Sequence, residues 1–105
     1  MKYNEKEILD EISDYISNTY SAHYSQNDGV QTLDLIDAIG DAEAFCRSNI
    51  LKYASRYDKK GTAKKDIFKV VHYAVLLLHF HNKPTLWVKL LYPKKHWMFL
   101  KTLAP

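Results

Sequence analysis

The chain has 105 residues, a formal net charge of +3, 47% hydrophobic residues and a single cysteine, Cys46. This length fits one domain with a modest core, and one cysteine forms neither an internal disulfide nor a cysteine-rich metal site. The longest apolar run, residues 70–80, falls short of the roughly 18 residues that span a bilayer, and charged residues stand where a secretory leader has its apolar run. We therefore expect a cytoplasmic protein without a membrane span.

Charge is divided unevenly along the chain. Residues 1–45 hold ten acids and two lysines, whereas residues 46–105 hold thirteen basic residues and two acids. The basic half can attract phosphates, or it can attract the acidic half of a second copy. We expect a homo-oligomer whose association weakens as salt is added.

The first predicted helix places its apolar side chains three and four residues apart, as amphipathic helices do. Its stripe consists of Ile8, Leu9, Ile12, Tyr15, Ile16 and Thr19, and Asn4 with Glu7 fits a capping box. Residues 21–31 are rich in Ser, Asn, Asp, Gln and Gly, a composition that predicts a loop.

Two more helices are predicted before residue 60. Thr32 caps a short helix that runs through Ile39 and is ended by Gly40, and Asp41 caps the next helix, from residue 42 to about residue 57.

A long helix follows, roughly residues 64–81, and Asn82, Lys83 and Pro84 end it. It carries an apolar stripe that we expect to be buried: Ile67, Val70, Val71, Ala74, Leu77 and Leu78. The pattern as a whole predicts an all-α protein, a compact bundle of three to four helices that forms one domain over residues 1–105.

Residues 83–105 form a basic, aromatic tail in which lysines alternate with Trp87, Tyr92 and Trp97. Such a tail can stack bases and neutralise the phosphates of a single strand, so nucleic acid is one possible partner. The alternative is that the aromatic rings pack on the bundle or on another subunit while the lysines stay in water.

Two polar rows are expected on neighbouring helices. Helical spacing places Phe45, Asn49, Lys52 and Arg56 along one side, next to Tyr53, and it places Asp66, Lys69 and Tyr73 along one side of the following helix. If the rows face each other, the three cations can hold phosphate oxygens. Alternatively, Asp66 pairs with Lys52 or Arg56 and only fixes how the two helices meet.

Four segments agree in order and spacing with one phage domain family. They are His23-Tyr24, residues 30–34 (VQTLD), residues 45–53 (FCRSNILKY) with Arg56, Lys60 and Gly61, and finally Asp66, Lys69 and Tyr73. The span 23–78 resembles this family, long considered uncharacterised, whose members include a phage nucleotide kinase. Ser48 departs from the pattern, which usually has Gly there and so permits a closer backbone approach.

The resemblance implies a nucleotide-binding helical domain, and for some members phosphoryl transfer from a nucleoside triphosphate with Mg²⁺ to a nucleoside monophosphate. The side chains that we expect to contact this nucleotide come from the two polar rows and the preceding loop: Asn49, Lys52, Tyr53, Arg56, Lys69, Tyr73 and His23. Asp34 and Asp66 are the candidates for orienting a metal, a water or a base. Because the glycines are scattered, a kinase here would lack a P-loop.

Other functions remain open at this point. The chain can bind a nucleotide or a nucleotide signal without turning it over, or it can be an interaction protein for a host protein or nucleic acid. We predict no resident metal. Asp34 and Asp37 stand three residues apart, as metal-binding carboxylates sometimes do, but acids in a first helical turn more often favour the helix dipole.

Overall fold

Four helices make up the part of the chain that the computed structural model describes, residues 2–23 and 32–83. They are α1 (Glu5–His23), α2 (Thr32–Ala38), α3 (Ala42–Arg56) and α4 (Ala63–Asn82), and no strand occurs in these ranges. Within these ranges the predicted all-α class and the predicted three to four helices are confirmed. None of these helices is both long enough and apolar enough to cross a bilayer. The predicted aromatic tail, apart from its first residue Lys83, lies outside the described residues.

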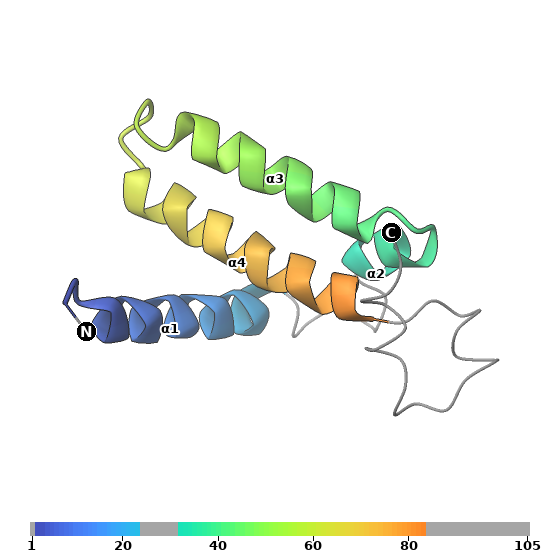
Figure 1. The fold of residues 1–105 in the computed structure, drawn as a ribbon, viewed down its shortest axis with the longest axis horizontal. Coiled ribbons are helices and arrows are strands. Elements are labelled where there is room, and N and C mark those ends of the chain that lie inside the picture. The colour runs from blue at the N-terminus through green and yellow to red at the C-terminus, as the bar shows by residue number, and fades with distance from the viewer. Residues whose placement is uncertain (1, 24–31, 84–105) are drawn as a thin grey trace.

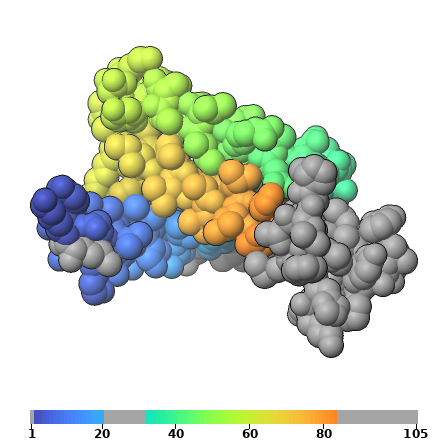
Figure 2. Space-filling model, in the orientation of Figure 1, coloured from blue at the N-terminus to red at the C-terminus, as the bar shows by residue number. Residues whose placement is uncertain are grey.

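The helices lie side by side, with α4 in the middle (Figure 1). α3 runs antiparallel to α4 and packs along its length, α1 lies against the other edge of α4, and α2 contacts the beginning of α3. Part of the surface of α4 is therefore exposed between its two neighbours, as the space-filling view shows (Figure 2).

The turn between α2 and α3 follows the sequence prediction. Gly40 has a φ of +87°, its N–H donates to the carbonyl oxygen of Asp37 at 3.0 Å, and the N–H of Asp41 donates to that of Ile36 at 3.0 Å. These two bonds form a Schellman motif, in which glycine accepts the left-handed conformation at no steric cost. The side chain of Asp41 makes no capping hydrogen bond, so only its backbone role was predicted correctly.

The start of α1 and the following loop differ from the prediction. Glu5, rather than Glu7, supplies the carboxylate that accepts the backbone N–H of Tyr3, and Asn4 stands at the helix start with a φ of 60°. α1 then continues to His23, so the predicted loop starts at least three residues later than expected. The rest of that loop lies outside the described residues.

The buried interior of the described part is small. Its apolar members are Ile12, Ala42, Cys46 and Tyr53, and two polar residues, Asp66 and His72, are buried with them. Cys46 is fully buried, and burial, followed by the nearby charge of Glu43, raises the pKa of its thiol. A thiol in this environment is a core residue rather than a nucleophile.

The prediction that the apolar stripe of α4 is buried is wrong for three of its six residues. Ile67, Ala74 and Leu78 are exposed, and Val70, Val71 and Leu77 are half-buried. The reason is geometric, because α3 packs against the side of α4 that carries Asp66 and Tyr73, and α1 packs against the side that carries Phe68 and His72. The apolar stripe lies largely on the remaining side.

An aromatic cluster joins α1 to α4. The ring of His72 lies 6.3 Å from that of Tyr15 and 5.9 Å from that of Tyr20, both edge-on, and Tyr15 also contacts Phe68 with ring centroids 5.4 Å apart. His72 is only 8% exposed, and its Nε2 has no hydrogen-bond partner within the described part of the chain. Burial lowers the pKa of His72, so folding disfavours the protonated form of this imidazole.

The lowered pKa of His72 makes stability depend on pH. Above pH 6.5, the ordinary pKa of histidine, the ring is neutral in the folded and the unfolded protein, so its protonation does not reduce the free energy of unfolding. Below that pH the unfolded chain binds a proton more readily than the folded one, so the free energy of unfolding falls as pH falls. We expect the urea midpoint to decrease from pH 7.5 to pH 5.5, and His72→Phe to reduce this decrease. His79→Gln, at an exposed histidine of the same helix, should leave it unchanged; an equal slope in all three proteins would refute the assignment.

Candidate functional site

Three cationic side chains meet at the ring of Tyr53, where α3 packs on α4. The guanidinium carbon of Arg56 lies 4.6 Å from the ring centroid, and the ammonium nitrogens of Lys52 and Lys69 lie 4.7 Å and 4.9 Å from it. Lys52 and Arg56 come from α3, whereas Lys69 comes from α4. We call these four residues the tyrosine–cation cluster.

Aromatic rings fix the position of Tyr53. Tyr53 is buried and stacks on Tyr73 of α4, with centroids 6.0 Å apart and planes 9° apart, and Phe45 of α3 meets Tyr73 edge-on at 5.9 Å. Such pairs add about 0.5–1.5 kcal/mol each beyond the burial of their area. The two polar rows predicted from the sequence therefore do face each other, and their aromatic members hold the cluster in place.

Asp66 is the one acid in contact with the cluster among the described residues. It is 1% exposed; its Oδ1 accepts a hydrogen bond from Nη2 of Arg56 at 3.2 Å, and its Oδ2 accepts one from the hydroxyl of Thr62 at 3.2 Å. The pairing of Asp66 with Arg56, one of the two arrangements that the sequence left open, is the one observed. With both oxygens bonded inside the protein, Asp66 positions Arg56 and does not face a ligand.

The cluster carries more positive than negative charge. Three cations against one carboxylate leave a surplus of two positive charges around a single ring. Because each cation lies within 5 Å of the same centroid, no two of them can be more than about 10 Å apart, a separation comparable with the Debye length of about 8 Å at physiological salt. Their repulsion is therefore only partly screened, and a bound anion would relieve it.

Two further polar groups lie beside this charge. Asn49 is half-buried on the same side of α3 and donates one amide hydrogen to the carbonyl oxygen of Phe45 at 2.9 Å, which fixes its orientation. Nε of Arg56 is buried and lacks a hydrogen-bond partner among the described residues. An unsatisfied donor of this kind costs about 1–3 kcal/mol, and an acceptor atom of a ligand or water would remove that cost.

Asp34 and His23 are not brought to the cluster. Asp34 lies in the first turn of α2, before α3 begins, whereas Arg56 ends α3, and the fifteen residues of α3 rise by about 22 Å. The structure thus separates the two predicted catalytic acids, Asp34 and Asp66, at opposite ends of the hairpin. His23 is the last residue of α1, and its side chain lies outside the described part.

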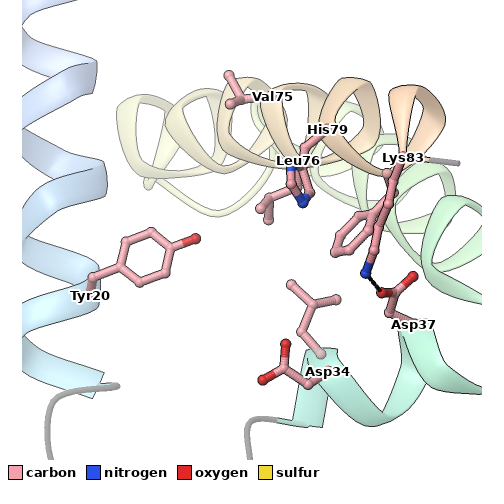
Figure 3. Close-up of a pocket in the computed structure, with 9 residues that line it drawn as sticks. Tyr20, Asp34, Asp37, Val75, Leu76, His79 and Lys83 are labelled. Atoms are coloured by element: carbon pink, nitrogen blue, oxygen red, sulfur yellow. Dashed lines mark hydrogen bonds and ion pairs between the residues drawn. The ribbon is translucent and has the colours of Figure 1, made fainter. Parts of the chain in front are cut away.

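Asp34 instead lines a cavity of about 500 Å³ between α1, α2 and α4 (Figure 3). Within this cavity Asp37 pairs with Lys83, as the dashed line in the figure shows. The lining residues are Tyr20, Leu33, Asp34, Asp37, Val75, Leu76, His79, Phe80 and Lys83. The sequence did not reveal this cavity, because its residues come from three helices. Only the spacing of Leu76, His79 and Phe80 on α4 hints at it.

Residues that could hold a metal do not gather in the described ranges. No three side chains of His, Cys, Asp or Glu come together there, and the ring of His81 pairs with Glu43 at 2.9 Å.

The helices and their cluster define a small all-α domain with a cationic site, and the sequence places that domain in a family. Residues 18–75, more than half of the chain, match the family described as protein of unknown function, DUF3310, and the chain belongs to this family. The matched segment contains every residue of the tyrosine–cation cluster as well as Asn49, Asp66 and Tyr73. No curated protein and no solved structure matches the chain significantly.

The position of Asp66 predicts the effect of removing its charge. Asp66→Asn leaves the guanidinium of Arg56 without its counter-charge while keeping an oxygen for Thr62, so we expect the free energy of unfolding to fall by about 1–3 kcal/mol. Urea denaturation measures this loss. Asp58→Asn, at an exposed acid of the turn between α3 and α4, should change stability by less than about 0.5 kcal/mol; equal losses in both variants would contradict the role of Asp66.

Proposed function

We propose that this protein binds the phosphate groups of a nucleotide at the tyrosine–cation cluster. The observation that carries the proposal is the meeting of three cations from two helices at one buried ring, with a single carboxylate that is already bonded on both oxygens. A purely structural network would balance its charges, whereas this one keeps a surplus that suits a multiply charged anion.

Each of the three cations would contact the phosphates in its own way, since a guanidinium is a planar set of donors and an ammonium group is a compact charge. Asp66 and the face of Tyr53 hold the guanidinium of Arg56, so its planar set of donors is oriented before a ligand arrives. Lys52 on α3 and Lys69 on α4 act as point charges, and Asn49 adds a neutral polar group. Side chains ordered in advance lose less entropy on binding, which favours affinity.

Phosphoryl transfer is a second candidate activity. The resemblance to a family with a nucleotide-kinase member favours it, as do cations that can neutralise the charge of a transferring phosphoryl group. Transfer also needs a group that orients the attacking oxygen. Asp66 is occupied and Asp34 lies at the far end of α3, so the described geometry supports binding more strongly than catalysis.

Substitutions in the cluster should weaken nucleotide binding. We expect Arg56→Ala and Lys69→Met each to lower the affinity for a nucleoside triphosphate by about tenfold or more, since a hydrogen bond to a charged group contributes about 1.5–3 kcal/mol. Affinity should also rise from mono- to triphosphate and fall with added salt. Isothermal titration calorimetry measures all three effects.

Lys59→Met is the matched control, because Lys59 is an exposed lysine in the turn between α3 and α4. It should bind nucleotides as the unaltered protein does. Urea denaturation of each variant separates lost binding from lost folding. If Lys69→Met stays folded and binds as well as Lys59→Met, the cluster is not the nucleotide site.

A product assay separates binding from transfer. The protein is incubated with Mg²⁺, a nucleoside triphosphate donor and a nucleoside monophosphate acceptor, and transfer converts the pair into two diphosphates. We expect thermal stabilisation by the nucleotides. If the unaltered protein and Lys59→Met form diphosphate and Lys69→Met does not, the protein is a kinase. Thermal stabilisation without diphosphate would establish a binding protein. Absence of any stabilisation would reject nucleotide binding and favour a protein or nucleic-acid partner.

A further inference from the structure

A continuous apolar stripe on α4 has no neighbouring helix in the described part of the chain. It consists of Ile67, Val71, Ala74 and Leu78, of which Ile67 is 44% exposed and Leu78 61% exposed, while Ala74 is exposed and Val71 half-buried. Val75, 53% exposed, lies at its border. Adjacent apolar side chains on a surface mark interaction sites far more often than single ones do.

The spacing of the stripe fits packing against another helix. Its residues follow one another at intervals of four, three and four, which keeps them on one side of α4 and matches the seam along which two helices interlock. α3 and α1 occupy other sides of α4, as their contacts with Tyr73 and with His72 show. Among the described residues, the stripe is thus a surface of α4 on which no helix packs, although α4 is held on two other sides.

We propose that α4 of a second copy packs antiparallel on this stripe, so that the protein forms a two-fold symmetric dimer. In this register Ile67 of one copy lies opposite Leu78 of the other, and Val71 lies opposite Ala74. The surface is then self-complementary, as a two-fold interface requires, since every contact between the two stripes occurs twice with the roles of the copies exchanged.

Charge complementarity selects the antiparallel direction. Residues 56–66, at the start of α4, carry five cations (Arg56, Lys59, Lys60, Lys64 and Lys65) and two carboxylates, a surplus of three positive charges. At the other end of the hairpin, residues 34–43 with 79–83 carry four carboxylates (Asp34, Asp37, Asp41 and Glu43) and one lysine, a surplus of three negative charges. An antiparallel pair brings the basic end of each copy to the acidic end of the other, whereas a parallel pair opposes like charges.

The dimer leaves the tyrosine–cation cluster accessible. Lys69 stands two residues from Val71, which at about 100° per residue places it on the opposite side of α4 from the stripe. The proposal therefore does not rest on the nucleotide site, and either can fail while the other holds.

Sedimentation velocity of the full chain tests the dimer. We expect the 12.3 kDa protein to sediment as a dimer at micromolar concentration, with a dissociation constant that rises with salt. Leu78→Glu places a charge in the stripe and should weaken association at least about tenfold. Leu51→Glu, at a leucine of α3 that is 66% exposed and lies away from the stripe, should not change it. A monomeric unaltered protein, or equal weakening by both variants, would overturn the proposal.

Cross-linking tests the direction of pairing without relying on a disruptive variant. Ile67→Cys and Leu78→Cys are mixed and treated with a short bifunctional maleimide, and unaltered protein, whose Cys46 is buried, serves as the background. Antiparallel pairing predicts mixed 67–78 products, because two copies of position 67 would lie about 16 Å apart along the helices. Products that link 67 to 67 and 78 to 78 would overturn the antiparallel dimer.

Discussion

The buried carboxylate of Asp66 is the constraint on which the described architecture depends. Asp66 lies in the first turn of α4 and contacts Arg56, the last residue of α3, so one ion pair fixes how the two helices meet at the turn. Arg56 in turn lies against Tyr53, and Tyr53 stacks on Tyr73, which follows Asp66 by seven residues, or about two turns of α4. A buried ionic pair contributes little net stability but strongly disfavours any register that leaves a charge unpaired.

This choice of interface explains the distribution of apolar surface. The α3–α4 hairpin uses tyrosines, a phenylalanine and an ion pair where an ordinary helix pair uses aliphatic side chains, so α4 turns part of its aliphatic stripe outward. The same rotation brings Lys69 toward Tyr53. A cationic site on one side of α4, and on the other an apolar stripe that none of the described helices covers, are thus two results of a single helix orientation.

Local signals in the sequence predicted the helices well, and they predicted burial poorly. Gly40 and the Lys59–Gly61 turn act through backbone conformation, which neighbouring residues determine, so the ends of α3 and α4 were predicted to within about two residues. Which residues of α4 are buried depends on the sides that its neighbours occupy. A prediction from hydrophobic periodicity assumes that the neighbours pack against the most apolar side. Spacing correctly paired the rows of Asn49, Arg56 and Lys69, but it could not place Asp34 relative to them, because that distance depends on the whole of α3.

The small interior has a consequence for how long the protein persists in a cell. Within the described ranges only four apolar side chains are buried, so the helices alone supply a narrow margin over unfolding. Anything that binds the folded chain then adds to that margin in proportion to the logarithm of its concentration. Proteases that act on transiently unfolded chains would remove copies that have found no ligand or partner, so the amount of protein would follow the supply of what it binds.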